Sequence, residues 1–264
     1  MTPPTNLEHS LTVLVHTTDT FEDCWEPFFT LLAYYWPTRR AAVLLNTQFK
    51  EFHSGDPSIR SAKVGNPSSF DLKRSWSCRL LAGLQQINTP YVLYLQEDYF
   101  LNAPVDSEML MRCLREIDKG NADYVGFYCS EPESTLTPVD DALALVPQKA
   151  NYRLCTQAGI WRKSTLLKYT VPGESVWQWE RYGSRRAHRG NERFLCTRRN
   201  IPSVFPYIPT GVVRGRWYAP AVVDLFAKHC INVDFSKRGF YEPGWVARKV
   251  QQWRSALRRV YMKV

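Results

Sequence analysis

The sequence lacks the features that would assign it at once to a secreted, zinc-binding or membrane class. Its seven cysteines are scattered without a Cys-x-x-Cys pair, so we expect reduced, buried thiols and neither a disulfide framework nor a zinc site. No apolar stretch approaches the roughly 20 residues that a membrane-spanning helix needs. The first residues show no basic and then apolar signal segment. We therefore expect a cytoplasmic protein, with peripheral attachment to the inner face of a membrane left open.

Internal repeats, low-complexity segments and an evident linker are also absent. The 264 residues are 44% hydrophobic and 14% aromatic, which is enough for a folded core and argues against global disorder. The net charge of +9 predicts an anionic partner, either a nucleic acid, an acidic membrane surface or a phosphorylated small molecule.

Apolar segments of strand and helix type alternate through the first half of the chain. Strands are expected at 11–16, 41–45, 91–96 and 124–129, and helices at 21–36, 75–87 and 106–118, with a Gly-, Pro- and Ser-rich loop at 49–72. This alternation predicts an α/β fold with a mostly parallel sheet flanked by helices. After residue 130 the pattern loosens, and we expect an irregular C-terminal half with extended segments at 152–161 and 204–213 and helices at 164–169 and 220–229.

The run from Tyr91 to Leu101 carries the strongest functional signal. A buried strand ends abruptly in Glu97 and Asp98, and carboxylates at the carboxyl end of such a strand lie where open α/β sheets bind ligands. The structural alternative is an acidic strand end that faces water or pairs with a basic side chain.

Several short motifs together resemble one family. They are Thr17-Thr18-Asp19 after the first strand, Glu97-Asp98, Gln157-Ala-Gly-Ile-Trp-Arg162, Glu174-Ser-Val-Trp-Gln-Trp-Glu180, Gly183-Ser184, Gly211-Val-Val-Arg-Gly-Arg-Trp217 and Arg238-Gly239. In this combination the chain resembles the nucleotide-sugar glycosyltransferases of the GT-A fold, most nearly the bacterial and viral members that build surface polysaccharides. The resemblance implies a Rossmann-like catalytic domain over residues 1–244. It also implies transfer of a sugar from a nucleotide-diphosphate donor to a glycan or lipid-linked glycan acceptor.

The resemblance also implies a divalent cation, Mn²⁺ or Mg²⁺, at the strand end. Asp98 matches the last acid of the family's Asp-x-Asp motif and would bind the metal, while Glu97 would contact the sugar or reach the metal through water. The sequence departs from the motif because Gln96 replaces the first acid, and no histidine lies in 205–228 to complete the site. Arg214 and Arg216 would then grip the diphosphate, since guanidinium groups match phosphate oxygens.

Glu180 is the candidate general base, which would deprotonate the acceptor hydroxyl in an inverting transfer. Trp177 and Trp179 precede it and would stack on sugar rings. The alternatives are a surface glutamate paired with a neighbouring arginine, and tryptophans that simply pack in the core. His188 lies among arginines and fits a basic loop better than a catalytic role.

Four further residues are expected to contact the donor. Thr17 and Asp19 would bind the base or ribose, Asn46 ends the second strand beside them, and Arg74 would reach a phosphate. Their structural alternatives are helix capping for Asp19, a turn for Asn46 and a solvated charge for Arg74.

Residues 245–264 form a basic amphipathic segment without an acidic residue. A helix here would lie on an anionic membrane surface or dock its apolar stripe on the catalytic domain.

Other function classes remain open at this point. The charge and the aromatic content also suit a nucleic-acid-binding module, although no recognised motif supports one. A nucleotidyltransferase also uses strand-end acids with a metal, but the Gly-rich basic loop usual in that class is missing from 16–23. A GT-A-like binding module without activity is the third alternative.

Overall fold

The structure is a computed structural model that describes residues 7–65, 75–208 and 210–242. The chain divides into two compact units, Met1–Pro209 and Thr210–Val264. No boundary near residue 210 was expected from the sequence. Arg74 and the basic segment 245–264 lie outside the described residues. Within the described ranges, no helix is both long and apolar enough to cross a bilayer.

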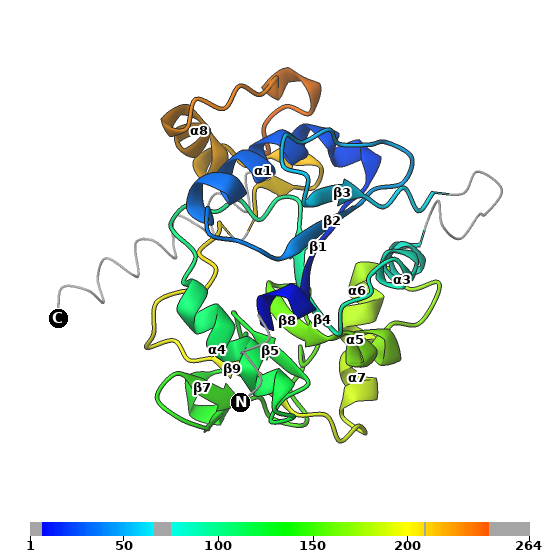
Figure 1. The fold of residues 1–264 in the computed structure, drawn as a ribbon, viewed down its shortest axis with the longest axis vertical. Helices are drawn as coiled ribbons and strands as arrows, with labels where there is room; N and C mark the ends of the chain where they lie inside the picture. Colours follow the sequence, from blue (N-terminus) through cyan, green and yellow to red (C-terminus); the bar gives the residue numbers. More distant parts are fainter. Residues whose placement is uncertain (1–6, 66–74, 209, 243–264) are drawn as a thin grey trace. The chain divides into compact units, whose positions relative to one another are not determined.

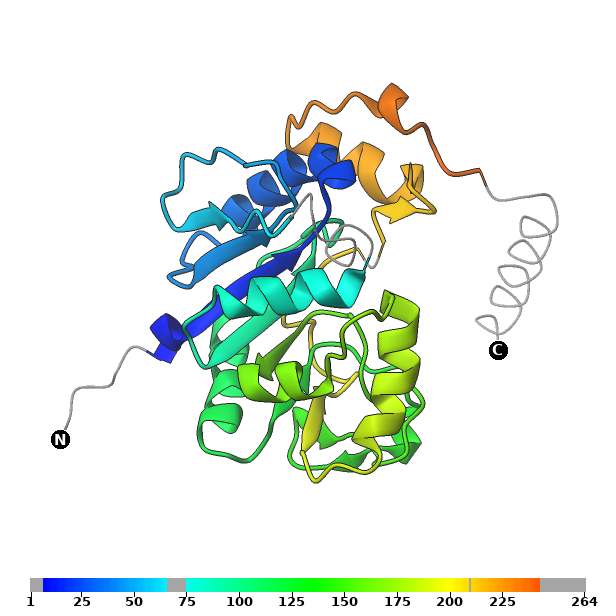
Figure 2. The same ribbon diagram turned by 90° about the vertical axis from the view of Figure 1, so that its right-hand side faces the viewer.

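The first unit is built on a nine-stranded sheet, whose strand order is β3-β2-β1-β4-β8-β5-β9-β7-β6 (Figures 1 and 2). The strands are β1 (Leu11–His16), β2 (Ala42–Asn46), β3 (Ile59–Ser61), β4 (Tyr91–Gln96), β5 (Tyr124–Gly126), β6 (Thr137–Pro138), β7 (Leu143–Leu145), β8 (Gly159–Arg162) and β9 (Phe194–Thr197). Strands β3, β2, β1 and β4 are parallel, whereas β8 and β7 are antiparallel to the strands on either side of them.

Helices pack around this sheet. They are α1 (Glu22–Tyr35), α3 (Trp76–Gln85), α4 (Ser107–Asp118), α5 (Lys163–Tyr169), α6 (Val176–Gln178) and α7 (Ser184–Ala187), with a π-helical turn, η4 (Trp179–Gly183), joining the last two. Short 3-10 turns lie at Leu7–Ser10, Asp19–Phe21 and Glu133–Thr135. The predicted α/β class, with a largely parallel sheet flanked by helices, is confirmed.

The clearest elements form where the sequence pattern is continuous. All six side chains of β1 are buried, as are the first five of β4, which is why their apolar runs predicted both strands to the residue. Helix α3 begins after Ser75 because its side chain accepts a hydrogen bond from the backbone N–H of Cys78, at 3.2 Å. Asp106 caps α4 in the same way through Met109, at 2.9 Å.

The elements that differ from expectation are short. The expected loop at 49–72 contains β3, and the loop after residue 130 contains β6 and β7. The expected strand 124–129 ends at Gly126, and only 159–161 of the expected 152–161 segment pairs in the sheet, in a strand that ends at Arg162. Strands of two to four residues carry too little alternation to be recognised from sequence, since their neighbours in the sheet supply the hydrogen bonds that define them.

The second unit contains the hairpin β10 (Val212–Val213) and β11 (Arg216–Trp217), helix α8 (Ala219–Lys228) and the 3-10 turn η5 (Phe235–Lys237). The buried Trp217 ring meets the rings of Phe226 and Phe235 edge-on, each with a centroid distance of 5.8 Å. This aromatic cluster forms the core of the unit.

Candidate functional site

The order of the parallel strands places a ligand site between β1 and β4. The chain runs outward from β1 to β2 and β3, and then returns to add β4 on the other side of β1. In open α/β sheets, ligands bind outside the carboxyl ends of the strands at such a reversal. His16 and Gln96, the last residues of β1 and β4, are paired partners in the register and mark this position.

A pocket of about 240 Å³ lies at this reversal. Its walls come from four separate segments, namely the end of β1 and the turn after it, the start of α3, the end of β4 and the start of α6. The lining residues are His16, Thr17, Thr18, Phe21, Trp76, Gln96, Glu97 and Val176. Two predicted donor-binding residues, Thr17 and Glu97, are therefore brought together here.

The starts of α3 and α6 are joined by backbone and side-chain hydrogen bonds. The backbone N–H of Ser77 donates to the Glu174 carbonyl at 3.1 Å, and the Ser77 hydroxyl accepts from the Glu174 N–H at 2.9 Å. These bonds hold Trp76 and Val176 on the same pocket.

His16 is buried at the base of this pocket and held neutral. The Nδ2 of Asn46 donates to His16 Nδ1 at 2.8 Å and to the Arg79 carbonyl at 2.9 Å. The carbonyl can only accept, so the group of Asn46 that faces it is the NH₂ group. Because an NH₂ group donates, His16 Nδ1 must accept, and the proton of the neutral ring resides on Nε2. Burial and the Arg79 charge together lower the pKa of His16 to about 3, with burial the larger cause, against an opposing effect of the Trp76 backbone.

The depressed pKa makes stability depend on pH through His16. The unfolded chain takes up a proton near the ordinary pKa of 6.5, whereas the folded protein does so only near pH 3. Stability from this residue is therefore complete above pH 6.5 and is lost as the pH falls below it. Between pH 7.5 and 4.5, we expect urea unfolding to show a loss about 2 to 3 kcal/mol larger for the parent than for His16→Gln. Parallel losses in the two proteins would contradict this assignment.

Asn46, a predicted substrate contact, is fully buried and holds the His16 ring instead. Gly83 of α3 makes room for it, because a Cβ at that position would lie 2.6 Å from Asn46 Cγ. Asn46 therefore positions a residue of the pocket wall and does not line the pocket.

Thr17 and Asp19 also contribute to the framework of the site. The Thr17 hydroxyl accepts from the Trp25 indole N–H at 3.0 Å. The Asp19 carboxylate accepts from the backbone N–H groups of Gln48 and Phe49 at 2.9 Å and of Lys50 at 3.2 Å. Asp19 therefore fixes the turn after β2, and its carboxylate does not cap α1, whose N-cap is Phe21.

The adjacent acids at the end of β4 face different neighbours. Glu97 is buried and lines the pocket. Asp98 is half-buried and lies toward Tyr99 and Tyr207; burial raises the pKa of both tyrosines, and the charge of Asp98 adds to both increases. Asp98 is not among the residues that line the pocket.

Arg79 is the principal charged residue that the sequence analysis missed. Its side chain is buried beside the pocket, and burial lowers its pKa while the charges of Cys78, Glu97 and Asp19 oppose that effect. Arg79 lies at helical spacing with the buried Leu80, Gly83 and Leu84 of α3, a stripe that would have identified the arginine as an inward-facing charge.

Glu180 is held in the π-helical turn η4 and is only 8% exposed. Its Oε1 accepts from the backbone N–H of Thr156 at 2.8 Å and from the Thr156 hydroxyl at 2.9 Å. Both bonds go to the same oxygen, and no further hydrogen bond to the carboxylate is seen among the described residues. The expected alternative, a surface glutamate paired with a neighbouring arginine, does not describe this geometry.

The two tryptophans before Glu180 have opposite environments. Trp177 is 76% exposed, so it does not pack in the core. Trp179 is 2% exposed, its indole N–H donates to the Thr170 hydroxyl at 3.2 Å, and its ring contacts Trp76 and Trp161. The expected stacking of Trp179 on a sugar is therefore corrected to core packing, because no face of the ring is accessible.

Tyr94 is buried, and the charges of both Glu97 and Glu180 act on its hydroxyl. Burial raises the pKa of Tyr94 well above its ordinary value, the Gln96 amide opposes this at 3.3 Å, and the charges of Glu97 and Glu180 both add to the increase.

The fit of a divalent cation depends on Asp98 and Glu97. No group of three His, Cys, Asp or Glu side chains that would hold a metal occurs among the described residues. Mg²⁺ and Mn²⁺ are nonetheless commonly held by one or two carboxylates together with phosphate and water oxygens. The strand-end pair suits a cation that arrives with a diphosphate, and metal binding by Asp98 stays a prediction.

Arg214 and Arg216 belong to the second unit, where Arg214 has a positive φ of 51° at the turn before Gly215. Their contact with a diphosphate stays a prediction, as does that of Arg74, which falls outside the described residues.

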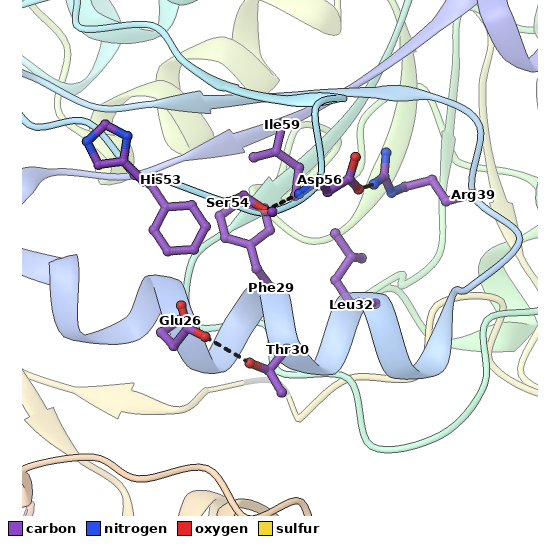
Figure 3. A pocket seen from close by; sticks show the side chains of 12 residues that line it. Glu26, Phe29, Thr30, Leu32, Arg39, His53, Ser54, Asp56 and Ile59 are labelled. Atoms are coloured by element: carbon purple, nitrogen blue, oxygen red, sulfur yellow. Dashed lines mark hydrogen bonds and ion pairs between the residues drawn. The ribbon is translucent and has the colours of Figure 1, made fainter.

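A separate pocket of about 240 Å³ lies between α1 and the loop 52–59 (Figure 3). Its polar groups largely satisfy one another. Asp56 pairs with Arg39 and accepts from Ser58, and the Thr30 hydroxyl donates to Glu26 at 3.5 Å. These contacts account for the pocket as part of the framework.

Comparison with known proteins gives structural likenesses only. No family model matches the chain, and no curated protein matches it. Residues 1–349 of S. aureus TarS match with a TM-score of 0.49 and 14% identity, over 86% of this chain and 68% of that one. The same fragment in complex with UDP-GlcNAc matches with a TM-score of 0.46 and 15% identity, over 86% and 69%. A CMP:2-keto-3-deoxy-manno-octonic acid synthetase complexed with CTP matches with a TM-score of 0.36 and 14% identity, over 74% and 92%.

Proposed function

We propose that the protein is a glycosyltransferase that takes a sugar from a nucleotide-diphosphate donor bound at the carboxyl ends of β1 and β4. The observation that carries the proposal is the pocket at the strand-order reversal, with Glu97 in its wall, together with the buried Glu180 held by Thr156. Such a transfer needs a site for the donor and a separate carboxylate for the acceptor hydroxyl. The acceptor in this proposal is a glycan or lipid-linked glycan of a surface polysaccharide.

Each acid has a distinct role in this scheme. Asp98 would hold a Mn²⁺ or Mg²⁺ ion, which would stabilise the negative charge that grows on the diphosphate as it leaves. Glu97 would contact the donor from the pocket wall. Glu180, fixed through Thr156, would take the proton from the acceptor hydroxyl as its oxygen attacks the anomeric carbon.

The donor side of the proposal is tested by calorimetric titration of the full chain with UDP-, GDP-, CMP- and dTDP-sugars, with and without Mn²⁺. We expect one nucleotide class to bind, and to bind more tightly with the ion. Failure of all four classes to bind would refute the proposal.

Two further results would favour a different function. Release of pyrophosphate from a nucleoside triphosphate and a sugar phosphate would identify a nucleotidyltransferase. Binding of a nucleotide sugar without hydrolysis or transfer to any acceptor would indicate a binding module.

A further inference from the structure

A second hollow, of about 530 Å³, lies beside Glu180 and is larger than the strand-end pocket. Its lining residues are Asn151, Tyr152, Trp177, Glu180, Arg181, Arg185 and His188. Its volume falls within the range usual for small-molecule sites. Val176 lines the strand-end pocket and Trp177 lines this hollow, so the two cavities flank the beginning of α6.

The hollow is lined by two segments that are hydrogen-bonded to each other, the helix from α6 to α7 and the chain at 150–156. Thr156 bonds Glu180, and the Leu154 N–H donates to the Ser184 hydroxyl at 3.0 Å. His188 Nε2 lies 2.9 Å from the Ala150 carbonyl. These contacts, at successive turns of the helix, fix both walls before any ligand binds.

Two exposed aromatic side chains border the hollow. Trp177 is 76% exposed and Tyr152 is 54% exposed, although both belong to residue types that folded proteins normally cover at least in part. Aromatic rings that remain exposed beside polar groups are typical of binding surfaces. Their flat apolar faces match the C–H face of a sugar ring.

The charge of the hollow is positive. Arg181 and Arg185 are exposed, and neither makes an ion pair with any described residue. The adjacent Arg186, by contrast, is held by both oxygens of Glu174, at 2.7 and 2.8 Å. The two exposed guanidinium groups lie four residues apart and are available to a carboxylate or phosphate of a ligand. Among the described residues, Glu180 is the one acid that lines the hollow, and its Oε1 already accepts from Thr156.

We infer that this hollow binds the acceptor, and that the acceptor is an anionic saccharide, bearing carboxylate or phosphate groups. That the ligand is the acceptor rests on the proposed function. That the ligand is an anionic saccharide rests on the residues that line the hollow. Sugar rings would lie on Trp177 and Tyr152, the anionic groups would meet Arg181 and Arg185, and a hydroxyl would face Glu180.

The test is titration of the full chain, without a nucleotide sugar, monitored by tryptophan fluorescence. The probes are a uronate-containing hexasaccharide, a phosphate-bearing oligosaccharide, and each of these with its anionic groups removed. We expect one of the anionic forms to bind at least about tenfold more tightly than its neutral counterpart, since charge-assisted hydrogen bonds are the stronger ones.

Matched variants distinguish binding in this hollow from attraction of the probe by the positive charge of the whole protein. Arg181→Gln/Arg185→Gln should weaken binding of the anionic probe at least about tenfold. Lys149→Gln/Arg189→Gln removes the same charge from exposed neighbours outside the lining and should change it less than about twofold. Trp177→Ala should weaken both the anionic and the neutral probe. All of these side chains are exposed, so we expect the variants to fold.

Three outcomes would overturn the inference. The first is that neither anionic probe binds, and the second is that neutral and anionic forms bind equally well. The third is that the control variant loses as much affinity for the anionic probe as Arg181→Gln/Arg185→Gln. Preference for a single-stranded oligonucleotide over both saccharides would also overturn it, in favour of a nucleic-acid ligand. If nucleotide sugars bind in a separate titration but no anionic saccharide does, this inference alone fails. If the saccharide binds but no nucleotide sugar does, the proposed transferase fails and the hollow remains a saccharide site.

Discussion

Replacing Glu180 with glutamine is expected to lower the rate of sugar transfer by about 10² to 10⁴, the usual effect of removing a general base. Donor affinity should change little, because Glu180 does not line the strand-end pocket. The amide oxygen of glutamine can still accept from Thr156, so the turn should keep its shape. The measurement is kcat and donor Kd for parent and variant, with thermal unfolding as the check on folding.

A matched control distinguishes the effect of the Glu180 carboxylate from that of the Thr156 hydroxyl that binds it. Thr156→Val removes the hydroxyl bond at 2.9 Å but leaves the backbone bond and the acid in place, so we expect a smaller decrease in rate than for Glu180→Gln. A decrease of less than about tenfold in the glutamine variant would show that Glu180 is structural. Glu174 and Asp19 are less suited to act as the base, because both carboxylates already have partners. Glu174 is bound to Arg186, and Asp19 is bound to the turn after β2.

Replacing Asp98 with asparagine is expected to abolish measurable transfer and to weaken donor binding in the presence of Mn²⁺. The amide keeps the shape of the side chain but loses the charge that would anchor the cation, and a Lewis-acid metal contributes several kcal/mol, or about 10³ or more in rate. Half-burial at the strand end makes a large effect on folding unexpected.

Titration with the donor, with and without Mn²⁺, identifies the residue that binds the metal. The Mn²⁺-dependent gain in donor affinity should disappear in Asp98→Asn and persist, reduced, in Glu97→Gln, because Glu97 faces the pocket. Turnover close to that of the parent in Asp98→Asn, with a chelator still inhibiting the parent, would show that another residue holds the ion.

The sequence predicted the parts of the site that depend on local patterns. The apolar runs of β1 and β4 identified both strands to the residue, and the acids directly after β4 identified the strand end. The fold class followed from the alternation of strands and helices. These features are local because a buried strand and its terminus are visible in consecutive residues.

The network around His16 was not accessible in this way. His16, Asn46 and Arg79 come from three elements, and their hydrogen bonds exist only once β1 pairs with β2 and α3 packs against them. A single sequence contains no signal for that register. Trp177 and Trp179 illustrate the same limit, since two residues of one type and two positions apart have opposite exposure.

The turn of residues 179–183 has a consequence for how this protein tolerates change. A π-helical turn contains about one residue more than an α-helical one, and the wider winding absorbs that residue without changing the direction in which the following side chains point. Deleting the exposed Tyr182 would therefore restore α-helical winding and leave Ser184 near Leu154 and Arg185 on the side that it shares with Trp177. Deleting Arg185 from α7 would instead rotate the residues that follow by about 100°. A single deletion is therefore expected to be tolerated better within 179–183 than in the α-helical turn after it.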